Sequence, residues 1–314
     1  MIKRGALRKI CISTLALVIL GIICVFPEAY TPNKIEESIS YTEAEKSVIY
    51  LLDKNNYVAR TNVIKKNSET TELIKEIISY LTIDSDTQDY IPGGFNSLIP
   101  KDTKILSMDL KDGLLKINFS KEFLNILLEH ENAMIESIVF SLTEIDDINQ
   151  IMIFVENENL TELPNSKKKI PLILDRSFGI NKIYDIKSIK ETCKVTSYYL
   201  AKDENNDYYY VPVTTVTNND KEKVEIIIEQ LKTAPIYQTN LISFLQANAE
   251  LLDYEILENK ISLSFNNYLF DDFNDKTILE EVKYAISYSI SDTYGIDSVS
   301  YLVENEKIDE LILP

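Results

Sequence analysis

Between residues 46 and 314, the pattern of apolar and polar positions indicates one series of strands and helices and then repeats it. Each stretch predicts the order strand, strand, helix, strand, strand, helix, strand. In the first stretch the clearest elements are a strand at 47–53, a helix at 69–82, a hairpin at 104–124, a helix at 131–145 and a strand at 150–160. In the second they are strands at 195–201 and 208–216, a helix at 220–233, a hairpin at 249–270, a helix at 277–294 and a strand at 297–308.

The helices and hairpins each show one apolar face. Leu73, Ile74, Ile77, Ile78 and Leu81 fall on one side of a helix. In the first hairpin, two alternating runs flank Asp112-Gly113, which favours a tight two-residue turn, and Glu258-Asn259 takes the same place in the second copy.

Landmarks in the two stretches lie at nearly constant separation. Phe119 matches Phe265, and the tetrapeptide Val-Glu-Asn-Glu begins at Val155 and again at Val303, 148 residues later. A repeat of this length indicates duplication of a whole domain. With one apolar face per element, we predict an α+β fold: two tandem two-layer domains, each a small mixed sheet with two helices on one face.

The N-terminus predicts a membrane segment. Four basic residues occur in positions 1–9, and residues 10–26 are uncharged and largely apolar, followed by Pro27. As a helix of about 25 Å this run is near the lower limit for spanning a bilayer. We expect residues 1–27 to be a retained anchor in the cell membrane, with the bulk of the chain outside the cytoplasm. Cleavage as a signal peptide and lipidation at Cys24 are the alternatives.

Composition narrows the functional classes. A net charge of -18 argues against a nucleic-acid binder, and a hydrophobic content of 45% is enough for packed cores. A single histidine, His130, excludes sites built from several imidazoles. No glycine-rich phosphate-binding motif occurs, and no cofactor is expected.

Other candidate chemistry is also weak. The run Asp84, Asp86, Asp89 lacks the glycine and glutamate of a calcium-binding loop, so no metal site is expected. We interpret His130 as a surface or capping residue and Cys193 as a half-buried strand residue. Because acids are abundant, a carboxylate pair acting on wall glycan, or a glycan-binding surface, stays open as an alternative.

Tyrosines offer a candidate interaction surface, because this residue buries area and keeps a polar tip. The 19 tyrosines include five on adjacent strand-like runs of the second copy: Tyr198, Tyr199, Tyr208, Tyr209 and Tyr210. Ordinary packing inside the domain is the other interpretation of the same residues.

The hairpin region resembles the GerM family of sporulation and germination proteins. The residues that carry the resemblance are 98–107, Lys111-Asp112-Gly113, 115–123 and Phe154-Val155-Glu156. This resemblance implies two tandem GerMN domains behind a membrane anchor, related to ring-building domains. We therefore expect an anchor at 1–27, a linker at 28–45, one domain at 46–185, a linker at 186–193 and a second domain at 194–314.

The same resemblance implies a function without catalysis. It predicts an envelope protein that helps to assemble or localise a complex between mother cell and forespore, with an effect on germination. The implied partners are other sporulation envelope proteins, including the channel between the two cells, and self-association is compatible with this role.

Overall fold

The computed structural model describes residues 14–15, 18, 45–233, 240–272 and 274–313. The chain divides into the units Met1–Glu43 and Ala44–Pro314, and every element named below belongs to the second unit. The predicted membrane segment lies almost entirely outside the described residues. Among the helices that are described, none is long and apolar enough to cross a membrane.

The first copy contains six principal strands and two α-helices in the predicted order. They are β1 (Lys46–Asp53), β2 (Val58–Ile64), α2 (Thr70–Leu81), β4 (Ile105–Lys111), β5 (Leu114–Phe119), α3 (Glu131–Leu142), β6 (Gln150–Val155) and the short β7 (Glu158–Asn159). A two-residue strand, β3 (Phe95–Asn96), pairs with the end of β1. The 3-10 turns are η1 (Gln88–Tyr90) and η2 (Lys121–Leu124).

The second copy repeats this order. Its elements are β9 (Cys193–Lys202), β10 (Tyr208–Thr217), α4 (Lys223–Leu231), β11 (Leu251–Leu257), β12 (Lys260–Phe265), η4 (Asn267–Leu269), α5 (Glu280–Tyr294), β13 (Ser298–Val303) and β14 (Glu306–Ile312). Between the copies lie η3 (Arg176–Phe178) and β8 (Ile183–Asp185). The α+β class is therefore confirmed.

The strands of each copy belong to two different sheets. Strands β4 to β7 form one four-stranded mixed sheet, and β11 to β14 form its counterpart. The first two strands of each copy instead enter a shared six-stranded sheet of order β3-β1-β2-β10-β8, with β9 paired to β10. One sheet thus contains strands from both copies.

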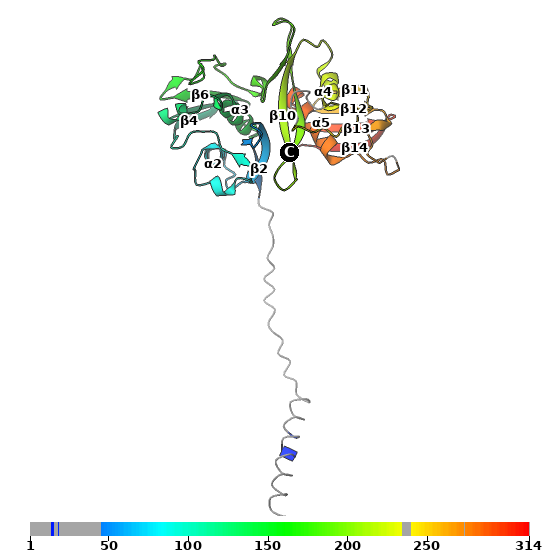
Figure 1. The fold of residues 1–314 in the computed structure, drawn as a ribbon, viewed down its shortest axis with the longest axis horizontal. Helices are drawn as coiled ribbons and strands as arrows, with labels where there is room; N and C mark the ends of the chain where they lie inside the picture. The colour runs from blue at the N-terminus through cyan, green and yellow to red at the C-terminus, as the bar shows by residue number, and fades with distance from the viewer. Residues whose placement is uncertain (1–13, 16–17, 19–44, 234–239, 273, 314) are drawn as a thin grey trace, which may run out of the picture. The chain divides into compact units, whose positions relative to one another are not determined.

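The expectation of a single small sheet with helices on one face was wrong. Helix α5 contacts β9 through the Ser289 hydroxyl and contacts β13 through the Tyr301 hydroxyl, so it lies between two sheets. Helix α3 is buried on nearly all sides and occupies the same place in the first copy (Figure 1). Each copy therefore has three layers, because its first two strands cover the helix face that the four-stranded sheet leaves open.

The predicted closing strands were also incomplete. Both are hairpins that turn at the repeated Val-Glu-Asn-Glu, with Val155 paired to Glu158 and Val303 to Glu306. The central Glu-Asn of each turn has positive φ, as a type I′ turn requires. The turn contains no glycine, which usually marks a type I′ turn in a sequence, and the segment was therefore predicted as one continuous strand.

The central hairpin was predicted correctly. Lys111 pairs with Leu114 around Asp112-Gly113, and both turn residues have positive φ. In the second copy Leu257 pairs with Lys260 around Glu258-Asn259. Phe119 and Phe265, the matched landmarks, end β5 and β12 and are fully buried in the core.

Candidate functional site

The two copies meet through equivalent residues 148 positions apart. The backbone N–H of Tyr50 on β1 donates to the Ser141 hydroxyl on α3 (2.8 Å), and the N–H of Tyr198 on β9 donates to Ser289 on α5 (2.9 Å). A buried serine in the C-terminal half of the helix thus fixes the first strand of each copy to its second helix. The same relation in both copies makes the contact approximately two-fold symmetric.

The tyrosine side chains meet at the centre of this contact, with their hydroxyl oxygens 3.0 Å apart. The Tyr50 hydroxyl donates to Glu144 (2.9 Å), and the Tyr198 hydroxyl donates to Asp292 (2.8 Å). Arg176, from η3 between the copies, forms ion pairs with both carboxylates. We call Tyr50, Glu144, Arg176, Tyr198 and Asp292 the central cluster.

Aromatic rings extend the symmetry. Tyr50 contacts Phe140 and Tyr198 contacts Tyr288, each at a centroid distance of 5.4 Å. The guanidinium of Arg176 lies 4.9 Å from the Phe140 ring, and that of Arg60 lies 4.3 Å from the Tyr288 ring. Each copy therefore presents one aromatic face to one arginine, a favourable pairing where water is excluded.

A single asparagine completes the shared sheet. Strands β2 and β10 pair directly only at Arg60 and Tyr210. Farther along, the Asn181 amide accepts from the N–H of Val58 (2.9 Å) and donates to the carbonyls of Val58 (2.8 Å) and Pro212 (2.7 Å). This side chain substitutes for the missing backbone hydrogen bonds between the copies.

The environment sets the charge of each acid in the cluster. Burial raises the pKa of Asp292, which is 4% exposed, against the opposing effect of Arg176. Burial also acts on Glu144, but the charges of Arg176 and Arg60 outweigh it and lower the pKa of that carboxyl. The two carboxylates converge on a guanidinium and two phenols, so their hydrogen-bonding capacity is used in holding the copies together.

The predicted tyrosine surface lies largely at this contact. Tyr198 and Tyr199 are buried, at 1% and 3% exposure, so these two candidates do not contribute to an exposed interaction surface. Tyr209 donates to Asp53 of β1 (2.7 Å), and the Tyr210 ring lies 5.2 Å from that of Tyr288. Only Tyr208 is exposed. The structure thus brings most of these side chains to an interface within the chain.

The residues considered as catalytic or metal-binding candidates do not come together in one site. His130 occupies the N-cap position of α3 but makes no capping hydrogen bond, and Cys193 on β9 is half-buried, as predicted. Asp84 pairs with Lys101 at 3.0 Å. Within the described ranges, no three His, Cys, Asp or Glu side chains are grouped so that they could hold a metal ion.

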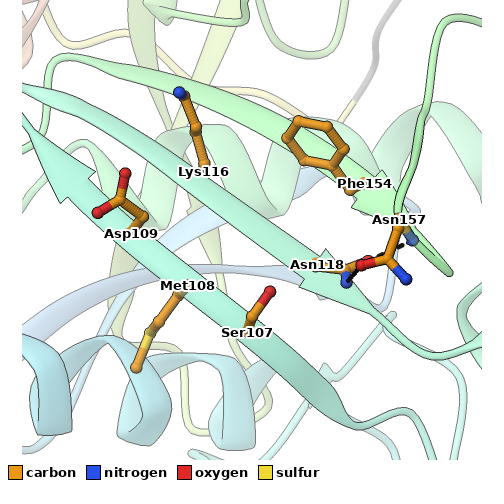
Figure 2. A pocket seen from close by; sticks show the side chains of 7 residues that line it. All are labelled: Ser107, Met108, Asp109, Lys116, Asn118, Phe154 and Asn157. Carbon is orange, nitrogen blue, oxygen red and sulfur yellow. Dashed lines mark hydrogen bonds between the residues drawn. The ribbon is translucent and has the colours of Figure 1, made fainter.

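A hollow of about 270 Å³ lies on the outer face of the first copy's sheet. Figure 2 shows the side chains that line it. Asn118 and Asn157 hydrogen-bond to each other there (2.9 Å), and Phe154 lies beside them. Asp109 and Lys116 face each other in register on β4 and β5. Apolar and pairable polar groups side by side are typical of a binding face.

Arg60, Glu144, Arg176 and Asp292 were missed by reasoning from the sequence. The available signal was the matched pair Ser141 and Ser289, each followed three residues later by an acid. Nothing marked Arg176, because it lies between the repeats.

Comparison with known proteins assigns the family. A family model described as "Sporulation and spore germination" (Germane) matches residues 48–161 and 196–309, which together form most of the chain. The chain belongs to this family. The GerM-type assignment and the tandem arrangement of two GerMN domains are thereby confirmed, whereas the exact limits predicted for the domains and linkers stay a prediction.

Two relatives agree with this assignment. The chain is 30% identical over 277 residues to the spore germination protein GerM of Bacillus subtilis (strain 168), covering 85% of this chain and 75% of that protein. The solved tandem GerMN domains of the sporulation protein GerM from Bacillus subtilis superpose with a TM-score of 0.78 at 26% identity. That match covers 86% of this chain and 97% of the other.

Proposed function

We propose that this member of the GerM family is a non-enzymatic assembly protein of the sporulation envelope. In this role it helps to assemble or localise a ring- or channel-type complex between mother cell and forespore, and influences germination through that complex. Residues 1–27 anchor it in the membrane, and the GerMN domains lie outside the cytoplasm.

The observation that carries the proposal is the central cluster. Its two acids converge, but both are paired with Arg176 and each accepts a hydrogen bond from a tyrosine hydroxyl, so they serve the contact between the domains. The cluster and the shared sheet join the two GerMN domains into one unit, which suits a protein that presents fixed surfaces to partners.

The test is partner capture in sporulating cells. The full chain, carrying an affinity tag, is crosslinked at intervals during sporulation and during growth, and its partners are identified by mass spectrometry. The proposal predicts envelope partners that appear only during sporulation, and an untagged strain controls for background. A protein that is equally abundant during growth and crosslinks to nothing would contradict it.

Catalysis is tested separately. The purified protein is incubated with purified wall material, and soluble fragments are measured. We expect no release above that of a heat-denatured sample, and release of defined fragments would refute the non-enzymatic role.

A further inference from the structure

Basic residues concentrate in the segment between the two domains. Eight of the chain's 32 Lys and Arg residues fall between positions 167 and 194, with only three acids, in a chain of net charge -18. The central cluster accounts for only one of the eight, Arg176. The others therefore need an explanation of their own.

The fold gathers four of these lysines around one pocket of about 320 Å³. We define the lysine pocket by six of the residues that line it: Lys168, Lys169, Phe178, Lys182, Tyr184 and Lys194. Lys168, Lys169 and Lys194 are exposed, and Lys182 lies deeper. The pocket thus offers several cations to solvent in an otherwise acidic protein.

Few of these cations are neutralised. Lys182 pairs with Glu136 at 2.5 Å, whereas the Lys194 ammonium donates to the uncharged Ser177 carbonyl (2.8 Å). Among the described residues, no carboxylate lies within ion-pair distance of Lys168 or Lys169. Asp175 is the one acid that lines the pocket, and it caps η3. Burial lowers the pKa of Lys182 against the opposing effect of Glu136, and the charges of Lys168 and Lys194 lower it further.

Apolar and aromatic residues form much of the remaining lining. Pro171, Ile173 and Tyr184 are exposed, Tyr184 at 59%, and Phe178 lies beneath the Lys182 ammonium at 3.9 Å. An inorganic anion would satisfy the lysines but leave this apolar surface uncovered. A ligand with both carboxylates and apolar side chains would use both halves of the pocket.

The backbone beside the pocket suits an extended ligand. Strand β8, which contains Tyr184, pairs with β10 on one side, and within the described part of the chain no strand pairs with its other side. Unpaired N–H and C=O groups on such an edge can bind an additional strand, while side-chain pockets select its sequence.

We propose that the lysine pocket binds an extended acidic segment of a partner protein, one that carries carboxylate and apolar side chains together. This inference rests on the proposed assembly function and specifies the chemistry of one partner.

The test measures binding of labelled peptides to the full-length protein by fluorescence anisotropy. The probe alternates glutamate and leucine; in one control peptide glutamine replaces glutamate, and in another serine replaces leucine. We expect the Glu-Leu peptide to bind most tightly and to weaken between about 0.05 and 0.3 M salt, because charge contacts are screened.

The variant Lys168→Glu/Lys194→Glu is compared with Lys111→Glu/Lys121→Glu, which makes the same change in net charge at exposed positions elsewhere. We expect the pocket variant to lose about tenfold in affinity and the control less than about twofold, since distant exposed charges contribute little. Equal losses would overturn the inference. Circular dichroism checks that both variants are folded.

Tyr184→Ser tests the apolar half. It should weaken binding of the Glu-Leu peptide several-fold and leave the Glu-Ser peptide unchanged. Tighter binding of polyphosphate or of phosphatidylglycerol vesicles than of the Glu-Leu peptide would assign the pocket to phosphate groups and refute a peptide ligand.

The outcomes separate this inference from the proposed function. If the peptides do not bind but sporulation-specific partners are still captured, only the lysine pocket has been misassigned. If the peptides bind but no partner is captured in cells, the assembly function fails while the binding chemistry stands.

Discussion

Replacing Arg176 by methionine tests whether the central cluster holds the two domains together. Methionine keeps much of the side-chain volume but leaves Asp292 and Glu144 without the cation that pairs with both. Removing one partner of a buried ion pair costs about 3–5 kcal/mol. Glu144 is 24% exposed and is also stabilised by the charge of Arg60, so it contributes less to this cost than Asp292 does. We therefore expect the free energy of unfolding to fall by about 3 kcal/mol.

Urea unfolding followed by circular dichroism measures this loss. With a slope of about 3 kcal/mol per molar, the midpoint should fall by about 1 M. The loss should also depend on pH. Burial already raises the pKa of Asp292, and without Arg176 it rises further. Because the folded state then binds the proton more tightly than the unfolded state, stability falls as pH rises, and the deficit should be greater at about pH 8 than at about pH 5.

A matched control removes an exposed pair. Lys276 lies 3.0 Å from Glu306, and both side chains are more than half exposed, so Lys276→Met should change stability by less than about 0.5 kcal/mol. If Arg176→Met is no more destabilising than Lys276→Met, or if its deficit does not grow with pH, the reasoning about the cluster is refuted.

Three further predictions concern single positions. Gly113→Ala should lower the free energy of unfolding by about 1 kcal/mol or more, because φ is +79° and a Cβ would meet an asparagine side chain at 2.7 Å. Gly93→Ala, with open space around it, should be neutral or stabilising; thermal unfolding compares the two variants. Asn181→Gly tolerates the positive φ but loses the hydrogen bonds to β2 and β10, so it should destabilise by about 2 kcal/mol and speed amide exchange in β2; unchanged exchange would contradict its bridging role. Hydrogen bonds from Lys260, Lys307 and Ser298 lower the pKa of Glu310 to about 2. The stability that this carboxylate contributes is therefore present above its usual pKa and is lost as pH falls toward 2. A Glu310 carboxyl that titrates near its usual pKa of 4.5 by NMR would refute this prediction.

Elements with a strong local signal were predictable from the sequence. The helix at Thr70–Leu81 begins and ends within a residue of the predicted range, because its apolar residues recur on one face. Asp112-Gly113 predicted the turn of the central hairpin, since both residues accept positive φ. The duplication followed from landmarks such as Phe119 and Phe265, which are buried in equivalent strands.

The contact between the copies was not predictable in the same way. Periodicity tells which face of β1 or β9 is apolar, but it does not tell whether that strand joins the sheet of its own copy or one shared with the other copy. Arg176 and Asn181 belong to no repeat, and their roles depend on partners more than 30 residues away. For the tyrosines of the second copy the sequence left two interpretations open, an interaction surface and internal packing, because composition does not tell which side chains are covered by the other copy.

Spore yield in cells that carry an uncharged central cluster tests the account most directly. In the variant Glu144→Gln/Arg176→Met/Asp292→Asn, amide oxygens still accept from the tyrosine hydroxyls. The three charges of the central cluster are removed together, and Arg60 keeps its contact with the Tyr288 ring. We predict that the urea midpoint of this variant is closer to that of the native protein than the midpoint of Arg176→Met is. The variant should also accumulate normally and support spore formation at the native frequency. A variant that is folded and abundant but gives no spores would show that the charges act in more than holding the domains together, and would contradict the account.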